Sequence, residues 1–332
     1  MATPPHAPAD PPASTPAPEP TARIGFGLAA VGRPGYINLG RDRDLPPDRT
    51  VDAMRRRTHE LLDLAYADGV RDFDAARSYG RSEEFLAQWL DQREPPGVVV
   101  SSKWGYTYTA GWRVDAEAHE IKDHSLATYE RQLAETRALL GDRLDVYQVH
   151  SVTPDSPALT DPALHRALAE LAAHGVLVGL STSGPAQADA IRAALAVTVD
   201  GAPLFRSVQS TWNPLEPSAG PALAEAHAAG CRVMVKEALA NGRLAAPDSR
   251  LAPVLGPLSA ALGTTPDAVA LAAALHQPWA DVVLSGAATA AQLTSNLRAR
   301  QVVFTPTQLA TLAELAEPPS AYWRHRAGLP WN

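Results

Sequence analysis

The sequence predicts an α/β fold, the single-domain (β/α)8 TIM barrel, on three observations. Short apolar runs typical of buried β-strands alternate along the chain with segments of helical period, and this alternation indicates a parallel sheet. Eight strand–helix units can be counted, as a closed barrel of this class requires. The chain has 332 residues, and such a barrel takes about 250 residues as one domain.

The first four strands are predicted where apolar runs lie between turn residues, at 23–31, 69–74, 98–102 and 144–149. A loop rich in Gly, Arg and Pro follows the first strand at 32–49. The next segment, 50–66, is a predicted helix because Thr50 can cap it and apolar residues recur on one face. These inner residues are Met54, Leu61, Leu62 and Ala65. Further helices are predicted at 82–90 and 123–140.

The second half of the chain continues the same alternation. Four more short apolar runs predict strands at 176–180, 205–210, 232–235 and 281–284. Segments of helical period separate or follow them, at 161–174, 185–195, 220–229, 266–276 and 290–299, and an extra helix is predicted at 307–315. The barrel is therefore expected to span residues 23–316.

Composition and charge exclude several classes of function. The net charge of −7 and the lack of a long Lys/Arg run argue against a nucleic-acid partner. No stretch approaches the roughly 20 apolar residues of a membrane span. The one cysteine, Cys231, excludes an internal disulfide and fits a reducing, cytoplasmic location. No metal site is expected.

The two ends of the chain are predicted to lie outside the barrel. Residues 1–22 are rich in Pro and Ala and lack the basic start and apolar middle of a secretion signal, so a disordered tail is expected there. Residues 317–332 are expected to form a C-terminal tail near the active-site face.

Four polar residues stand at or just beyond the ends of predicted strands: Asp74, Tyr79, Lys103 and His150. In a parallel barrel the carboxyl ends of the strands share one face, where active sites of this architecture lie. Lysine is rare, with three among 29 basic residues, which favours a chemical role for Lys103. The alternatives are that Lys103 merely caps a strand and that His150 is a core histidine.

Three segments around these residues resemble motifs of the aldo-keto reductase superfamily. They are Asp74–Glu83 (DAARSYGRSE), Ser101–Gly105 (SSKWG) and Tyr147–His150 (YQVH), in the family's order and spacing. The resemblance implies an NAD(P)(H)-dependent oxidoreductase that reduces aldehyde or ketone groups to alcohols, or runs the reverse reaction. It makes Tyr79 the general acid, lets Lys103 and Asp74 tune that acid, and gives His150 the task of orienting the carbonyl.

A nicotinamide cofactor is implied, because no side chain supplies a hydride. No Gly-x-Gly-x-x-Gly follows the first strand, which argues against a doubly wound dinucleotide fold. The resemblance instead implies that the cofactor lies across the carboxyl face of the barrel. Its expected contacts are Ser181, Thr182, Gln209, Lys236, Leu239, Asn241, Gly242, Ser285, Gly286, Ala287, Gln292 and Asn296.

Two of these positions depart from the family pattern. Thr182 stands where an asparagine is more common, and Lys236 stands where an aromatic ring commonly stacks on the nicotinamide. Lys236 could pair with Glu237 on the surface, contact the pyrophosphate or reach a substrate anion. Residues 286–292 contain no Lys or Arg, which NADP-selective relatives usually carry there. NADP(H) is nevertheless the cofactor expected from the family, with NAD(H) as the alternative and Arg298 or Arg300 as the cation that could reach back.

The substrate is expected to be a small carbonyl or alcohol, held by aromatic residues. The long segment 104–122 is a predicted pocket wall, because long aromatic loops in compact domains are usually functional. The expected pocket residues are Trp104, Tyr106, Trp112, Trp212 and Trp323. An NAD-dependent aldose or polyol dehydrogenase and a nicotinamide-binding regulatory protein with little turnover are alternative functions. The sequence predicts neither the substrate nor the oligomeric state.

Overall fold

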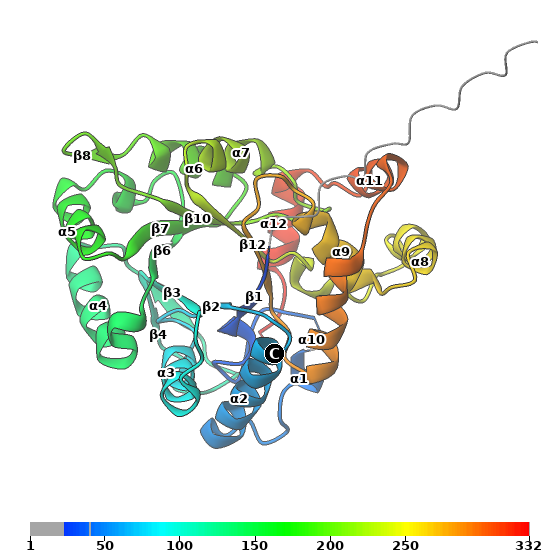
Figure 1. Ribbon diagram of the computed structural model, residues 1–332, viewed down its shortest axis with the longest axis horizontal. Helices are drawn as coiled ribbons and strands as arrows, with labels where there is room; N and C mark the ends of the chain where they lie inside the picture. Colours follow the sequence, from blue (N-terminus) through cyan, green and yellow to red (C-terminus); the bar gives the residue numbers. More distant parts are fainter. Residues whose placement is uncertain (1–22, 40, 332) are drawn as a thin grey trace, which may run out of the picture.

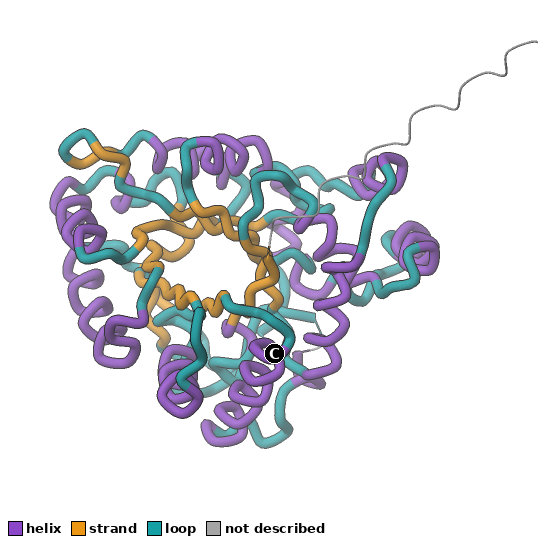
Figure 2. The backbone as a smooth tube through the Cα atoms, viewed as in Figure 1, coloured by secondary structure: helices purple, strands orange, loops and turns teal. Residues whose placement is uncertain are grey.

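The computed structural model describes residues 23–39 and 41–331, so the predicted N-terminal tail lies outside the described residues. Eight parallel strands close into a barrel in the order β1-β12-β11-β10-β7-β6-β3-β2, and Figures 1 and 2 show them around one axis. The predicted (β/α)8 fold is therefore confirmed. The strands are β1 (Arg23–Gly27), β2 (Asp72–Asp74), β3 (Val99–Trp104), β6 (Val146–Val152), β7 (Leu177–Thr182), β10 (Ser207–Thr211), β11 (Arg232–Lys236) and β12 (Val282–Ser285).

Helices surround the strands in a ring (Figure 1). Those that follow the barrel strands are α2 (Val51–Ala67), α3 (Ser82–Arg93), α4 (Leu126–Leu140), α5 (Pro162–Ala173), α6 (Gln187–Leu195), α7 (Gly220–Ala228), α9 (Pro266–Leu275) and α10 (Ala290–Leu297). Four more lie outside this alternation: α1 (Arg41–Asp44), α8 (Ala252–Ala261), α11 (Pro306–Ala313) and α12 (Pro319–Ala327). The segment predicted as a C-terminal tail therefore contains a helix.

The first helix forms for the reasons that the sequence gives. The Thr50 side chain accepts a hydrogen bond from the Ala53 backbone N–H at 3.2 Å, so the predicted cap is confirmed. The four predicted inner residues are all buried: Met54, Leu61, Leu62 and Ala65. Their helical spacing places them on one face, which packs into the main core together with the outer faces of the strands.

Several element boundaries differ from the sequence prediction. β1 ends at Gly27 because residues Leu28–Ala30 turn into a 3₁₀ helix, η1. The segment 104–122 contains an antiparallel pair, β4 (Tyr106–Tyr108) with β5 (Glu120–Lys122), where a loop was predicted. A second small pair, β8 (Thr198–Val199) with β9 (Ala202–Pro203), follows α6. Both pairs are too short for a periodic signal.

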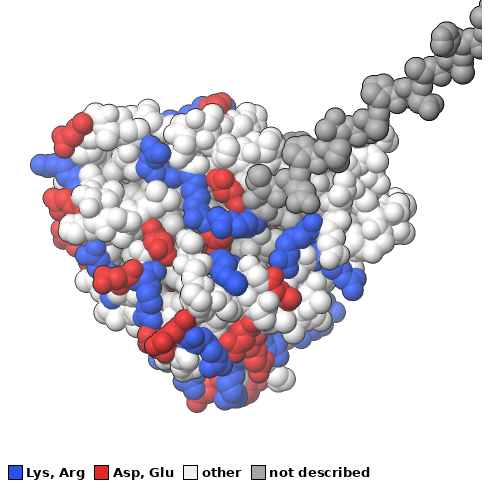
Figure 3. All heavy atoms as spheres, viewed as in Figure 1, with Lys and Arg blue, Asp and Glu red and all other residues white. Residues whose placement is uncertain are grey.

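Within the described ranges no single helix is long and apolar enough to cross a membrane; α8 and α9 pass that test only when joined across an 81° bend. On the face drawn in Figure 3, basic and acidic side chains are interspersed.

Candidate active site

The four candidate catalytic residues meet at the carboxyl end of the barrel. Asp74 ends β2, Lys103 lies near the end of β3, and His150 lies in β6, on three strands that are neighbours in the sheet. The Lys103 ammonium contacts the Asp74 carboxylate and donates to the Ala75 carbonyl at 3.0 Å. The Tyr79 hydroxyl lies 3.4 Å from His150 Nε2, and Lys103 Nζ lies 5.0 Å from the centre of the Tyr79 ring.

Two glycines hold the loop that carries Tyr79 against the loop after β1. A Cβ on Gly32 would lie 2.4 Å from the Tyr79 carbonyl oxygen, and one on Gly80 would lie 2.6 Å from the Gly32 carbonyl oxygen. Gly80 also has φ +60°, the left-handed region that favours glycine. The two backbones therefore touch directly, and this contact fixes the approach of Tyr79 to the barrel mouth.

Burial dominates the electrostatics of the two reacting groups. It raises the pKa of the Tyr79 phenol well above 10, with Arg33 as the opposing cation. A neighbouring ammonium such as that of Lys103 favours the phenolate and would by itself lower this pKa, so burial has the larger effect. Burial also lowers the pKa of the Lys103 ammonium, while Asp74 raises it. In this environment the phenol holds its proton at neutral pH and is available as an acid.

His150 is held as a neutral imidazole. Burial lowers its pKa well below 6.5, and the cations Lys103 and Lys236 lower it further. Its Nδ1 lies 3.4 Å from the Ser78 hydroxyl, so both ring nitrogens have polar neighbours. Its backbone carbonyl lies 2.8 Å from His124 Nε2. A neutral imidazole can donate from one nitrogen, as a carbonyl-orienting group must.

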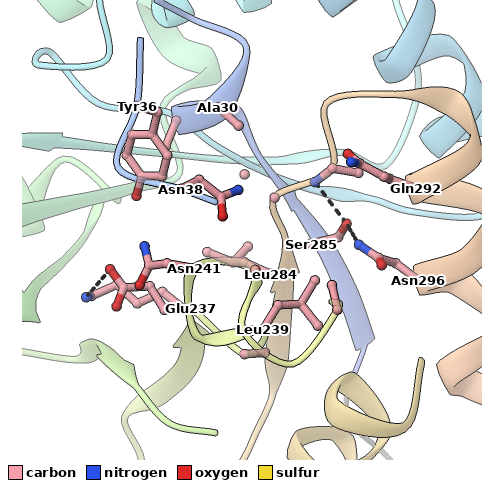
Figure 4. A pocket seen from close by; sticks show the side chains of 18 of the residues that line it. Ala30, Tyr36, Asn38, Glu237, Leu239, Asn241, Leu284, Ser285, Gln292 and Asn296 are labelled. Carbon is pink, nitrogen blue, oxygen red and sulfur yellow. Dashed lines mark hydrogen bonds and ion pairs between the residues drawn. The ribbon is translucent and has the colours of Figure 1, made fainter. Parts of the chain in front are cut away.

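A cavity of about 400 Å³ leads away from Tyr79. Asp74, Tyr79, Gln209 and Lys236 line what we call its catalytic end. Ten of the twelve predicted cofactor contacts line the cavity: Gln209, Lys236, Leu239, Asn241, Gly242, Ser285, Gly286, Ala287, Gln292 and Asn296. Figure 4 shows Tyr36 and Glu237 at one side of the view and Gln292 with Asn296 at the other.

Ser181 and Thr182 are not among the residues that line this cavity. Both are buried near the end of β7, where their hydroxyls bond to other groups. The Ser181 hydroxyl accepts from the Ser151 backbone N–H at 2.8 Å, and the Thr182 hydroxyl lies 2.6 Å from that of Ser210.

The opposite end of the cavity, which we call the nucleoside end, is lined by Ser285, Gln292, Asn296 and Asp267. With its amide oriented to satisfy both neighbours, Asn296 accepts from the Ser285 hydroxyl at 2.8 Å and donates to Asp267 Oδ2 at 2.7 Å. A carboxylate therefore stands at this end. No motif in the sequence pointed to this carboxylate, because Asp267 reaches the cavity from α9.

Arg43 of α1 and Arg57 of α2 are two cations at or near the wall of the cavity. Arg43 lines the cavity, and Arg57 donates to the Ala288 carbonyl at 3.0 Å. Arg300, one of the two cations that the sequence suggested, instead donates to the Asp68 carbonyl at 2.9 Å. The Gly- and Arg-rich composition of the loop after the first strand was the available signal for Arg43.

Lys236 and Glu237 form part of a buried group under α12. The Lys236 and Glu237 side chains are 15% and 8% exposed, so they do not form the surface pair considered from the sequence. The Arg326 Nε–H is shared between the two oxygens of Glu237, 3.0 Å from each. Burial raises the pKa of Glu237, but Arg326 and Lys236 outweigh it and lower that pKa to about 2.

The five predicted substrate-pocket residues fall into two groups according to what they contact. Tyr106 packs edge-on against His150, with ring centres 5.1 Å apart, and Trp323 lies 5.9 Å from Lys236 Nζ. Trp104 is fully buried against Tyr129, and Trp112 donates its indole N–H to the Arg49 carbonyl at 2.8 Å. Trp212 packs on Trp279, 5.9 Å away. The structure therefore places Tyr106 beside His150 and Trp323 beside Lys236, while the other three pack against other residues.

Arg33 is a site residue that the sequence did not indicate. It is 2% exposed, its guanidinium lies 5.3 Å from the Tyr79 ring centre and 4.7 Å from that of Trp331, and it pairs with Glu120 at 2.9 Å. Tyr36 and Asn38 line the cavity from the same loop. The loop after the first strand, although lacking a periodic pattern, forms one wall of the site.

Comparison with known proteins gives consistent matches. A model of the Aldo/keto reductase family matches residues 23–317. The curated aldo-keto reductase str7 of Strobilurus tenacellus is 31% identical over 184 residues, which are 54% of this chain and 49% of that protein. The matched segment thus spans about half the length of this curated relative.

Solved structures share the fold at low identity. The holo form of aldo-keto reductase AKR11C1 from Bacillus halodurans is 21% identical, with 89% of this chain and 92% of that chain covered and a TM-score of 0.66. A structure assigned to the aldo-keto reductases of Pseudomonas aeruginosa is 24% identical, with 84% and 90% covered and a TM-score of 0.59.

Proposed function

Because the chain belongs to the aldo/keto reductase family, we propose that it is a nicotinamide-dependent oxidoreductase that reduces an aldehyde or ketone to an alcohol through Tyr79. One observation carries the proposal. The buried Tyr79 phenol lies 3.4 Å from a neutral imidazole and beside a buried Lys103–Asp74 pair, all at the mouth of the barrel. A carbonyl bound there would have a proton donor, an orienting hydrogen bond and a nearby positive charge.

The chemistry assigned to each residue follows from its surroundings. When a hydride reaches the carbonyl carbon, negative charge develops on the oxygen and Tyr79 delivers the proton to it. The Lys103 ammonium favours the phenolate that remains, and Asp74 holds that ammonium in place. His150 orients the carbonyl oxygen through one ring nitrogen. The same groups, run backwards, oxidise an alcohol.

The cavity fits a nicotinamide cofactor, which would supply the hydride. Gly286 leaves space for a close approach of the backbone, since nothing lies within 4 Å of a Cβ built on it. Asn241 and Gly242 also line the cavity, and Gln292 and Asn296 offer amides at the nucleoside end. We propose these residues as the cofactor contacts.

NADP(H) is the proposed form, with Arg57 and Arg43 as the cations for its 2′-phosphate. Asp267 supports the second candidate, an NAD-dependent aldose or polyol dehydrogenase, because a carboxylate accepts hydrogen bonds from a ribose diol and repels a phosphate. Fluorescence titration with NADPH and NADH separates the two. Arg57→Gln is expected to weaken NADPH binding about tenfold and to leave NADH binding unchanged, a difference of about 1.4 kcal/mol. A tenfold preference of the unaltered protein for NADH would favour the second candidate.

The test of the reaction is turnover of an aldehyde and sugar panel with both cofactors, for the unaltered protein and Tyr79→Phe. The variant removes only the phenolic proton, so it is expected to bind cofactor normally and to lose about 10²–10⁴-fold in rate. Unchanged single-turnover rates would reject Tyr79 as the acid. Tight cofactor binding without turnover on any substrate would instead support a regulatory role.

A further inference from the structure

The catalytic end of the cavity carries one positive charge more than its carboxylates neutralise. Asp74 contacts the Lys103 ammonium, and Glu237 is held by Arg326. Lys236 is the third cation beside these two carboxylates, and its ammonium lies 3.8 Å from Glu237 Oε1. Glu237 is therefore shared between two cations, and the group as a whole is positive.

The surroundings of Lys236 compensate that charge only in part. Its Nζ donates to the neutral Thr211 hydroxyl at 2.8 Å, and the hydroxyl in turn donates to Glu237 Oε2 at 3.2 Å. Its further neighbours are Glu237 Oε1, 3.8 Å away, which Arg326 also holds, and the Trp323 ring, whose centre is 5.9 Å away. Because the side chain is only 15% exposed, water screens the ammonium less than it would at the surface, and its field extends over a few ångströms into the cavity.

The field of Lys236 acts where the reaction takes place. Lys236 and Tyr79 line the same end of the cavity. A hydride donor has to come within about 3–3.5 Å of the carbonyl carbon that it reduces. Since Tyr79 is the proposed proton donor to that carbonyl, the donor's ring belongs to the end of the cavity that Lys236 lines.

We propose that Lys236 makes the protein discriminate against the oxidised cofactor, an inference that rests on the proposed function. Hydride transfer moves two electrons and a proton to the carbonyl carbon, Tyr79 adds a proton to the oxygen, and the C=O bond becomes CH–OH. The nicotinamide ring is neutral before this step and positively charged after it. The Lys236 ammonium repels only the charged ring, so the reduced cofactor binds more tightly and the oxidised one is released more readily.

This discrimination acts on loading and release. The equilibrium between free reactants and products is fixed by the reactants, and the same repulsion opposes the hydride step itself. The consequence is that the protein binds reduced cofactor even when the oxidised form is present. The oxidised cofactor formed in the reaction therefore inhibits it only weakly. Lys236 thereby suits the site to carbonyl reduction.

The experiment measures the affinities of the reduced and oxidised cofactor by fluorescence titration and calorimetry. Lys236→Met removes the charge and Lys236→Arg keeps it. Lys122→Met is the matched control, because Lys122 is exposed and does not line the cavity. The ratio of oxidised to reduced dissociation constants is expected to fall about tenfold or more in Lys236→Met and to be retained in Lys236→Arg and Lys122→Met. Inhibition by oxidised cofactor should strengthen in parallel.

The outcomes separate this inference from the function on which it rests. If both cofactor forms bind and Lys236→Met leaves their ratio unchanged, the discrimination is refuted while the oxidoreductase stands. If neither form binds the unaltered protein, the proposed function fails and the inference with it. Should Lys236→Met not fold, Lys236→Gln, which keeps a donor for Thr211, must show the same fall in the ratio.

Discussion

Lys103 and Asp74 link the stability of the barrel to its chemistry. Their side chains are 0% and 3% exposed. The other oxygen of Asp74 accepts from the Ser101 hydroxyl at 2.8 Å and from the Gln209 amide at 3.0 Å. The carboxylate is thus fully committed to donors, and removal of the ammonium leaves a buried charge without its cation.

Lys103→Met is therefore expected to destabilise the protein by about 3–5 kcal/mol and to abolish turnover. Denaturant unfolding beside a turnover assay measures both effects. Lys122→Met, at an exposed lysine, should change neither by a comparable amount. An unfolding free energy equal to that of the unaltered protein would mean that Lys103 is a solvated strand cap.

Lys236→Met, unlike Lys103→Met, is expected to stabilise the protein. Burial lowers the pKa of Lys236 to about 8, against an ordinary 10.5. Between these values the unfolded chain binds a proton that the folded protein does not, so stability rises with pH across this window. Below pH 8 the cost of the buried charge is complete, at most roughly 3 kcal/mol. The variant should therefore be more stable at pH 7, and its advantage should shrink above pH 8 in pH-dependent denaturant unfolding. A variant that is less stable at pH 7 would contradict this.

The contact between the loops after β1 and β2 is the element on which the position of Tyr79 depends. Gly80→Ala is expected to lower stability by about 1–3 kcal/mol and to reduce turnover, because the new Cβ meets the Gly32 carbonyl. Gly97→Ala is the matched control. Gly97 also has a positive φ, +72°, but nothing lies within 4 Å of its Cβ position. Both variants share the backbone cost, so equal losses of turnover would show that the loop contact does not position Tyr79.

The strands and their polar ends could be predicted from sequence because both are local signals. An apolar run followed by Asp74 or His150 is visible in a window of about ten residues. Arg326 could not be found in this way, since its partner Glu237 lies 89 residues earlier. Asp267 likewise reaches the nucleoside end from a helix that contributes no motif. Tertiary contacts of this kind leave no periodic trace in the chain.

Buried neutral histidines make the whole molecule sensitive to acid. Burial lowers the pKa of His124 to about 4 and that of His150 well below 6.5. Both rings serve in the folded protein as neutral groups, and His124 joins Ser156 at 2.6 Å to the His150 carbonyl at 2.8 Å. Below pH 6.5 these histidines bind protons in the unfolded chain but remain neutral in the folded protein. The free energy of unfolding therefore decreases as the pH is lowered.

His124→Gln is expected to reduce this acid sensitivity. The pKa difference corresponds to about 3 kcal/mol of stability that is present above pH 6.5 and lost as the pH falls towards 4. Urea unfolding at pH 7 and pH 4.5 measures the slope, which should be shallower in the variant even if its stability at pH 7 is lower. An unaltered slope would assign the acid sensitivity to other groups.

The distribution of the lysines also bears on how the molecule can be handled. Lys103 and Lys236 are buried, whereas Lys122 is exposed on the β4–β5 pair and donates to the Ser151 carbonyl at 2.9 Å. Amine-reactive dyes and surface-coupling reagents would therefore find one accessible side-chain amine among the described residues. Lys122 is the last residue of β5, and His124 follows two residues later. A fluorophore attached there would sit next to the strand that carries His150, ready to report on events at the barrel mouth without a cysteine having to be introduced.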